Sequence, residues 1–137
     1  MKQLNLPVEE FTTPDPVTAD ENMEIDAVRQ LMADRGIRHL PIVRGGQVVG
    51  VISDRDVRVV WGLSPEHRHH VRAADIMAAD LVTVRSAAPL DEVAYLMSDK
   101  KVGSVLVYDD GGRFLGIFTL TDALNALIEI ARASGSR

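Results

Sequence analysis

The sequence contains no cysteine, only 4% aromatic residues and no long apolar segment. The absence of Cys among the 137 residues excludes disulfide bonds, thiolate zinc sites and a thiol nucleophile. No apolar run approaches the roughly 20 residues that a membrane-spanning helix requires. Residues 1–10 also lack the apolar stretch of a signal peptide. We therefore expect a soluble, cytoplasmic protein that does not insert into a membrane.

Positive charge is also scarce, because 15 Lys and Arg face 20 Asp and Glu, for a net charge of −5. Nucleic-acid binding requires a basic surface, so we do not expect this class of partner. The sequence also lacks a Walker-type glycine loop, a pair of His at metal-ligand spacing and a Ser/His/Asp constellation. These absences favour a binding module without a catalytic cofactor over an enzyme. The apolar content of 46% and the modest net charge predict a folded α/β chain.

The chain is a tandem repeat, in which the first half of the sequence aligns with the second. Residues 25–34 recur as residues 90–99, with apolar and acidic positions in the same order. One insertion in the turn at 109–112 shifts the alignment by a single position, after which residues 50–56 overlay residues 116–122. A single insertion in a turn is typical of two copies of one folded unit. A copy of about 55 residues buries little surface alone, so we expect the two to share a core.

Each copy has the same succession of periodic segments. In the first copy, apolar residues at helical spacing predict a helix over residues 25–32, and Gly36 is suited to end it with a positive φ. Two β-branched runs within residues 40–52 flank a glycine turn and predict a hairpin, and a helix follows at residues 57–61. The second copy repeats this order, although Lys101 replaces the helix-ending glycine. We therefore predict a strand, a helix, a hairpin and a helix in each copy.

Short motifs in both copies resemble a known family. They are residues 75–77 followed by 81–84, residues 36–43, and two Gly-x-x-Ser/Thr-x-x-Asp segments that begin at Gly50 and Gly116. Each copy resembles a CBS domain, the module named after cystathionine beta-synthase, and the pair resembles a Bateman module. The resemblance implies an α/β fold of tandem β-α-β-β-α repeats packed about a pseudo-two-fold axis.

The resemblance extends over most of the chain, from about Val8 to Ala131. It implies CBS domain 1 at residues 8–62, a linker at 63–71 and CBS domain 2 at 72–131. The helices that end the two copies have apolar faces, which favour self-association into a two-fold homodimer.

The two Gly-x-x-Ser/Thr-x-x-Asp segments allow two interpretations. Ser53 with Asp56, and Thr119 with Asp122, have the spacing of a capping box, in which the hydroxyl and the carboxylate satisfy a helix N-terminus. Alternatively, a hydroxyl and free N–H groups at a helix N-terminus suit a phosphate, and an Asp one turn later can accept hydrogen bonds from a ribose diol. The spacing alone leaves both interpretations open, and the two are compatible.

The family resemblance implies a ligand and its contacts. It implies an adenine nucleotide (AMP, ADP or ATP) bound in the cleft between the two CBS domains, with the bound state signalled to a partner protein. S-adenosylmethionine and NAD are alternative ligands, and a ligand-free interaction scaffold is an alternative function. The implied nucleotide-binding residues are Thr18, Arg38, His39, Ser53, Asp56, Thr83, Ser104, Thr119 and Asp122.

The two copies differ where the family contacts phosphate. Arg38-His39 in the first copy aligns with Gly103-Ser104 in the second. Arg can pair bidentately with phosphate, and His adds a partner that titrates near neutral pH. We therefore expect the Asp56 site to be the better nucleotide site. Alternatively, Arg38 and His39 lie on the exposed face of an edge strand. Other cations that could supply a phosphate contact are Arg55, Arg58, Lys100 and Lys101.

Three histidines between the copies raise the possibility of a metal site. His67, His69 and His70 lie within residues 62–70, whose composition predicts a linker, with Arg68 among them. They do not form the i, i+4 pair that fixes ligand geometry on a helix. We expect a solvated linker and no metal.

Overall fold

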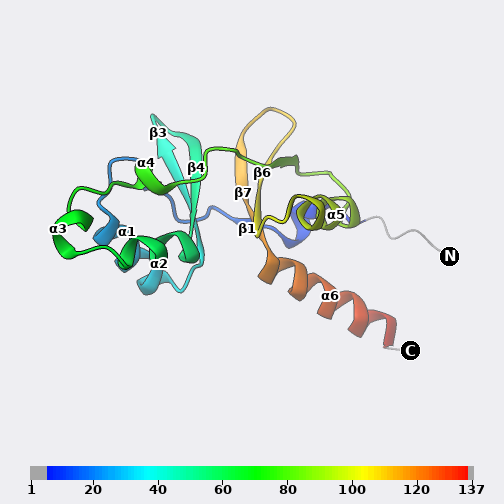
Figure 1. Cartoon of the computed structure of the whole chain (residues 1–137). Coiled ribbons are helices and arrows are strands. Elements are labelled where there is room, and N and C mark those ends of the chain that lie inside the picture. Colours follow the sequence, from blue (N-terminus) through cyan, green and yellow to red (C-terminus); the bar gives the residue numbers. More distant parts are fainter. Residues whose placement is uncertain (1–5, 136–137) are drawn as a thin grey trace. The chain divides into compact units, whose positions relative to one another are not determined.

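The computed structural model describes residues 6–135, which form two compact units. Residues 16–81 form one unit (the 16–81 unit), and residues 6–15 together with 82–135 form the other (the 82–135 unit). Figure 1 shows the succession of helices and strands along the chain. Within residues 6–135, none of the helices has the length and apolar character to cross a membrane.

The 16–81 unit is built on a three-stranded sheet. The sheet order is β2-β3-β4, with β2 parallel to β3 and β3 antiparallel to β4. Apolar residues of α1, α2 and the sheet form one buried cluster, which includes Val28, Leu40 and Val57. The elements are β2 (Ala19–Asp20), α1 (Ile25–Arg35), β3 (His39–Arg44), β4 (Gln47–Ser53), α2 (Asp54–Trp61), α3 (Pro65–Arg68) and α4 (Ala73–Ile76).

The 82–135 unit repeats this plan and has its own core. Its sheet order is β1-β7-β6-β5, with β5 parallel to β6 and β6 antiparallel to β7. Val93, Val105 and Phe118 are buried in its apolar cluster. The elements are the 3-10 helix η1 (Val8–Phe11), β1 (Thr13–Pro14), β5 (Thr83–Arg85), α5 (Leu90–Lys100), β6 (Ser104–Tyr108), β7 (Phe114–Thr119) and α6 (Leu120–Gly135). The predicted α/β fold with a strand, helix, hairpin and helix in each copy is confirmed.

Each unit contains a short segment from the sequence of the other repeat. η1 and β1 lie at the start of the first repeat but belong to the 82–135 unit, where Val8 is fully buried. Ala73 of α4 aligns with Val8 in the repeat and is fully buried in the 16–81 unit. The compact units therefore divide the chain differently from the domain boundaries at 8–62 and 72–131. The physical reason is that each segment extends the free edge of a sheet and adds apolar side chains to its core.

Two equivalent glycines allow these segments to approach the sheets. A side chain at Gly50 of β4 would collide with the side chain of Met77, and one at Gly116 of β7 would collide with the backbone of Thr13. Next to Gly50, Val51 and Ala78 exchange backbone hydrogen bonds of 3.0 and 2.9 Å. The lack of a side chain at both glycines thus permits the backbone contact that completes each unit.

The ends of the first helices test one prediction from the sequence. Gly36 ends α1 with φ 61°, as predicted, and the equivalent Lys101 ends α5 with φ 56°. This left-handed conformation costs a non-glycine residue roughly 1–2 kcal/mol. Both units therefore end this helix in the left-handed conformation, although only the 16–81 unit has the glycine that favours it.

Residues 62–70, predicted to be a linker, contain the short helix α3. The Ser64 side chain accepts a hydrogen bond from the backbone N–H of His67 and caps this helix. The guanidinium carbons of Arg29 and Arg68 lie 4.2 and 4.3 Å from the Trp61 ring centroid. These cation–π contacts join α1, α2 and α3 within the 16–81 unit.

Candidate functional site

The junction of β4 and α2 forms the first candidate site. The Asp56 backbone N–H donates to Ser53 Oγ over 3.2 Å, and the Ser53 backbone N–H donates to Asp56 Oδ2 over 2.9 Å. This is the predicted capping box, and it fixes both side chains at the N-terminus of an eight-residue helix. Ser53 and Asp56 are half-buried, so both remain accessible to a ligand.

The junction of β7 and α6 forms the equivalent box in the 82–135 unit. The Thr119 backbone N–H donates to Asp122 Oδ2 over 2.9 Å, and the Asp122 N–H donates to Thr119 Oγ1 over 3.3 Å. The Thr119 hydroxyl also donates to Asp122 Oδ2 over 3.1 Å. The hydroxyl of Thr13 in β1 donates to Asp122 as well, with distances of 3.1 Å to Oδ1 and 3.3 Å to Oδ2.

The two carboxylates consequently differ in their hydrogen bonding. Asp122 accepts from three donors: the Thr119 N–H, the Thr119 hydroxyl and the Thr13 hydroxyl. Among residues 6–135, the only group that donates to the Asp56 carboxylate is the Ser53 N–H. A carboxylate offers about four lone-pair sites. Asp56 therefore retains acceptor capacity that Asp122 has largely used.

His39 lies beside the first box because it pairs with Ser53 across β3 and β4. Burial lowers the pKa of the His39 imidazole below its ordinary value. The carboxylates of Asp54 and Asp56 oppose this pKa shift, and the Arg38 guanidinium reinforces it. The free site thus favours the neutral imidazole, and a bound anion would raise the pKa and favour the protonated form.

Arg38 immediately precedes β3, and its carbonyl accepts a 2.9 Å hydrogen bond from the N–H of Asp54, the first residue of α2. The strand itself lies between β2 and β4, but β2 pairs only with Ile42 and Val43, so His39 has a strand neighbour on one side only, at Ser53. The Arg38 side chain is exposed, and within residues 6–135 no carboxylate forms an ion pair with it. It is therefore available to an anionic ligand.

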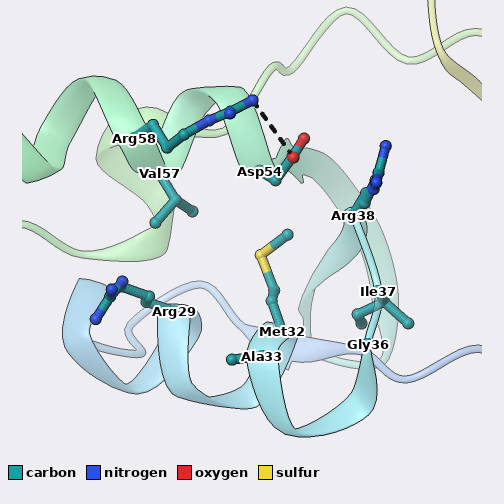
Figure 2. Close-up of a pocket in the computed structure, with 9 residues that line it drawn as sticks. All are labelled: Arg29, Met32, Ala33, Gly36, Ile37, Arg38, Asp54, Val57 and Arg58. Carbon is teal, nitrogen blue, oxygen red and sulfur yellow. Dashed lines mark hydrogen bonds and ion pairs between the residues drawn. The ribbon is translucent and has the colours of Figure 1, made fainter.

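Arg38 also lines a groove of about 360 Å³ between α1 and α2. Figure 2 shows where the arginine side chains start, with Arg29 on α1, Arg58 on α2 and Arg38 beside the strand, and it shows the Arg58 side chain extending toward Asp54. Arg58 forms a 3.5 Å ion pair with Asp54, and the groove has an apolar base. The lining residues are Arg29, Met32, Ala33, Gly36, Ile37, Arg38, Asp54, Val57 and Arg58.

The equivalent positions of the 82–135 unit are not charged. In the alignment of the two copies, the three arginines correspond to Ala94, Gly103 and Leu124. Asp54 corresponds to Leu120, and both leucines are exposed, by 55% for Leu120 and 60% for Leu124. The same helix pair is therefore cationic in one unit and apolar in the other.

The remaining predicted site residues lie on the first strands and on β6. Ser104 pairs with Thr119 across β6 and β7, at the position equivalent to His39 and Ser53. Thr83 is the exposed first residue of β5, and Thr18 is exposed immediately before β2. Strand pairing and hydrogen bonds thus bring His39, Ser53 and Asp56 together in one unit and Ser104, Thr119 and Asp122 together in the other. Within residues 6–135, no side-chain hydrogen bond joins Thr18 or Thr83 to these groups. Thr13 is the residue that sequence reasoning missed, because its contact depends on the segment that joins the 82–135 unit.

The histidines near α3 show no metal-site geometry. Among the described residues 6–135, no group of three or more His, Cys, Asp or Glu side chains is arranged to hold a metal ion. His67 Nδ1 instead lies 2.8 Å from Ser64 Oγ.

Comparison with known proteins adds a family match. The model of the CBS domain matches residues 8–61 and 73–129. A CBS domain-containing protein of Dictyostelium discoideum is 32% identical over 125 residues, which cover 83% of this chain and 84% of that protein. Other curated relatives are longer, and the chain spans only 21–45% of the length of three of them. One of these is inosine-5′-monophosphate dehydrogenase of Thermoplasma acidophilum, of which 21% is matched.

Solved structures with a similar fold include a CBS domain pair. The Vibrio cholerae protein assigned to acetoin utilization (AcuB) is 26% identical with a TM-score of 0.84, and the match covers 98% of both chains. The CBS domain pair of protein MJ0100 is 28% identical with a TM-score of 0.79, over 90% of this chain and 97% of that one. The latter structure holds 5′-methylthioadenosine and S-adenosyl-L-methionine.

Proposed function

The chain belongs to the CBS domain family, and we propose that it is a regulatory module that binds an adenine nucleotide (AMP, ADP or ATP). A partner protein then responds to the bound state, because ligand binding shifts the population of conformations that the partner recognises. In this proposal the chain is a binding module and performs no chemistry. The observation that carries it is the accessible Asp56 carboxylate, with its spare acceptor capacity, in the first turn of α2.

The ribose is bound by Asp56 in this proposal. A ribose 2′,3′-diol presents two adjacent O–H donors, and a carboxylate can accept both. Because Asp56 accepts only from the Ser53 N–H among the described residues, both donors find acceptor sites without displacing a protein group. Hydrogen bonds to a charged acceptor contribute about 1.5–3 kcal/mol each, so this contact accounts for much of the affinity.

The phosphates are bound beside the N-terminus of α2. The partial positive charge of a helix N-terminus attracts an anion, and the Ser53 hydroxyl and His39 imidazole lie at the same junction. Arg38 adds a permanent positive charge, and its backbone carbonyl accepts a hydrogen bond from the first residue of α2. Thr18 contributes to the adenine pocket in this proposal, by its place before the first strand.

The 82–135 unit supplies a second, weaker site in this proposal. Thr83, Ser104, Thr119 and Asp122 are the equivalents of the residues of the first site. This site lacks the cationic pair, because Gly103-Ser104 stands in place of Arg38-His39. We expect it to bind phosphate less well.

Self-association is part of the proposal, since α6 exposes an apolar row. Its exposed members are Leu120, Leu124, Leu127 and Ile128. Burial of this row against a second copy in a two-fold homodimer would remove apolar surface from water.

A second ligand class is supported by one specific observation. The MJ0100 domain pair, 28% identical to this chain, is described with 5′-methylthioadenosine and S-adenosyl-L-methionine. Both ligands have the ribose diol that Asp56 would bind, but neither has a phosphate for Arg38 and His39. A preference for S-adenosylmethionine over AMP would therefore favour this second candidate.

Calorimetric titration tests the proposal directly. AMP, ADP, ATP, NAD, S-adenosylmethionine and 5′-methylthioadenosine are titrated into the wild-type chain and into Asp91→Asn, a control that alters an exposed Asp in the first turn of α5. We expect both proteins to bind an adenine nucleotide equally well, with a higher affinity for AMP than for 5′-methylthioadenosine, which has no phosphate. If none of the six ligands binds at millimolar concentration, the chain is a ligand-free scaffold and the proposal is wrong.

A further inference from the structure

Thr13 donates a hydrogen bond to the Asp122 carboxylate, and the equivalent position of the 16–81 unit in the repeat alignment is Ala78, which has no side-chain donor. We infer that the Thr13 hydroxyl prevents a ribose diol from binding the Asp122 carboxylate, whereas Ala78 leaves the Asp56 carboxylate accessible. The residue at this position therefore determines which unit binds the nucleoside. The inference rests on the proposed function and goes beyond it by naming a specificity-determining residue outside the Gly-x-x-Ser/Thr-x-x-Asp segments.

The Thr13 hydroxyl occupies the acceptor sites of Asp122 that a diol needs. It lies 3.1 Å from Asp122 Oδ1 and 3.3 Å from Oδ2. The N–H and hydroxyl of Thr119 donate to Oδ2 over 2.9 and 3.1 Å. With three donors present and about four lone-pair sites on a carboxylate, roughly one site remains. A diol requires two, so it must displace Thr13 to bind in the same way.

Ala78 occupies the same place in the 16–81 unit but cannot donate. The repeat alignment relates Thr13 to Ala78, and it also relates their strand partners, Ile117 and Val51. Thr13 pairs with Ile117, and Ala78 pairs with Val51. A methyl group therefore stands where the 82–135 unit has a hydroxyl. Asp56 keeps about three acceptor sites, enough for both donors of a diol.

The neighbouring hydroxyls differ in the same sense. Thr119 Oγ1 donates its proton to Asp122 Oδ2 while it accepts from the Asp122 N–H. Ser53 Oγ accepts from the Asp56 N–H, and among residues 6–135 no acceptor takes its proton. Ser53 can therefore donate to a ligand without breaking an internal hydrogen bond. Donor and acceptor are both available in the 16–81 unit and are both occupied in the 82–135 unit.

The size of the effect follows from one hydrogen bond to a charged acceptor. A diol that binds Asp122 must break the hydrogen bond between the Thr13 hydroxyl and the carboxylate, and the hydroxyl must then bond to water or to the ligand. The loss of one hydrogen bond to a charged acceptor lowers affinity by about tenfold. Since Thr13 and Ala78 are both exposed, a substitution at either position adds or removes a hydroxyl without changing the core.

Two pairs of variants isolate the hydroxyl from the shape of the side chain. Ala78→Thr adds the hydroxyl to the 16–81 unit, and Ala78→Val adds the same bulk without it. Thr13→Val removes the hydroxyl from the 82–135 unit and keeps the branched shape, and Thr13→Ser keeps the hydroxyl. The probes are adenosine and 2′-deoxyadenosine, which lacks one of the two diol donors, and the readout is calorimetric affinity and stoichiometry per chain.

We expect wild type to bind one adenosine per chain and to discriminate against 2′-deoxyadenosine. Ala78→Thr weakens adenosine binding about tenfold relative to Ala78→Val and reduces the discrimination. Thr13→Val strengthens the second site about tenfold, so the stoichiometry approaches two, whereas Thr13→Ser behaves as wild type. Far-UV circular dichroism and the unfolding midpoint verify that each variant is folded.

The two possible failures give different results. If wild type binds adenosine and Asp56→Asn removes binding, but Ala78→Thr equals Ala78→Val and Thr13→Val equals wild type, the inference about this position is wrong and the proposed function stands. If no protein in the series binds adenosine or AMP at millimolar concentration, the proposed function is wrong and the inference falls with it.

Discussion

The two units have the same backbone plan but opposite surface chemistry. Between α1 and α2, the 16–81 unit has Arg29, Arg38 and Arg58, where the 82–135 unit has Ala94, Gly103 and Leu124. The core positions that define each fold stay apolar in both, as at Val28 and Val93. In a chain with a net charge of −5, the arginines gathered on one unit favour anion binding there. The exposed leucines favour contact with another apolar surface on the other unit.

The candidate carboxylates differ in the same direction. Asp56 has a single donor among the described residues, and Asp122 has three. Duplication has therefore kept the capping box in both units, where it is needed for the helix, and left spare acceptor capacity mainly in one. The difference predicts a division of labour, with ligand binding concentrated in the 16–81 unit.

The largest expected effect concerns the segments that complete the units. Gly116→Ala should destabilise the protein by about 3 kcal/mol, because its methyl group would collide with the Thr13 backbone. Gly50→Ala should cost about 1–2 kcal/mol, because the collision is with the Met77 side chain, which can move in part. Urea denaturation of both variants, with Gly135→Ala as control at an unobstructed position, measures the difference. Equal losses at Gly50 and Gly116 would contradict this account of how the segments dock.

The next effect concerns the charge asymmetry itself. Arg38→Gly gives the 16–81 unit the residue of the 82–135 unit and should weaken ATP binding by about 10–100-fold, as loss of a charged phosphate contact does. Adenosine binding should change little, since adenosine has no phosphate. The control is Arg35→Ala, which removes another exposed arginine at the end of α1. Alanine is used there because glycine would also destabilise the helix. A parallel loss of ATP and adenosine affinity in Arg38→Gly would show that Arg38 does not act on phosphate.

The helix ends provide a smaller effect on stability. Lys101→Gly should stabilise the protein by about 1 kcal/mol, because glycine adopts φ 56° without the cost that Lys incurs. Gly36→Lys should destabilise it by a similar amount, since Gly36 has φ 61°. Chemical denaturation of the two variants checks both signs. If Lys101→Gly fails to stabilise, the strained helix end is compensated by contacts of the Lys side chain.

The smallest effect is the pH dependence of nucleotide binding. The pKa of His39 lies below its ordinary value in the free protein, chiefly because of burial. A phosphate beside the imidazole raises this pKa, so binding takes up a proton and ATP affinity increases a few-fold as pH falls through and below about 6.5. Calorimetry in buffers of different ionisation enthalpy measures the uptake. In His39→Ser, which copies Ser104 of the other unit, the uptake should vanish, and its persistence would assign the proton to another group.

The same pKa shift predicts the stability of the free protein. Because the folded pKa of His39 is below the unfolded value, the unfolded chain binds the proton more readily. The contribution of neutral His39 is therefore complete above about pH 6.5 and is lost as pH falls from there toward the folded pKa. Ligand affinity and unliganded stability should thus change in opposite directions over this range.

Much of the fold followed from the repeat, and the rest required the structure. The hairpins, the helix end at Gly36 and both capping boxes are local patterns, so the sequence predicted them. The exchange of the segments before the repeats was not predicted, because an alignment of two copies treats each as self-contained. The contact between Thr13 and Asp122 was missed for that reason, because the two residues are 109 positions apart in the sequence.

The arginine groove was predicted only in part. Arg38 and Arg58 were recognised as cations near the first capping box, but Arg29 lies on a different helix and its place depends on how α1 packs against α2. The replacement of all three in the second copy is visible in the sequence once the positions are known to share one groove. Packing between helices is the information that periodicity does not provide.

The most direct test of the account compares AMP binding by Asp56→Asn and Asp122→Asn. Each Asn retains an oxygen that can accept the capping N–H, so both variants are expected to fold. Each Asn also replaces one acceptor oxygen by an NH2 donor and removes the negative charge that strengthens hydrogen bonds from a ribose diol. We expect at least a tenfold loss of affinity in Asp56→Asn and an affinity close to wild type in Asp122→Asn. Loss of AMP binding in Asp122→Asn with unchanged affinity in Asp56→Asn would contradict the central claim that the 16–81 unit is the nucleotide site.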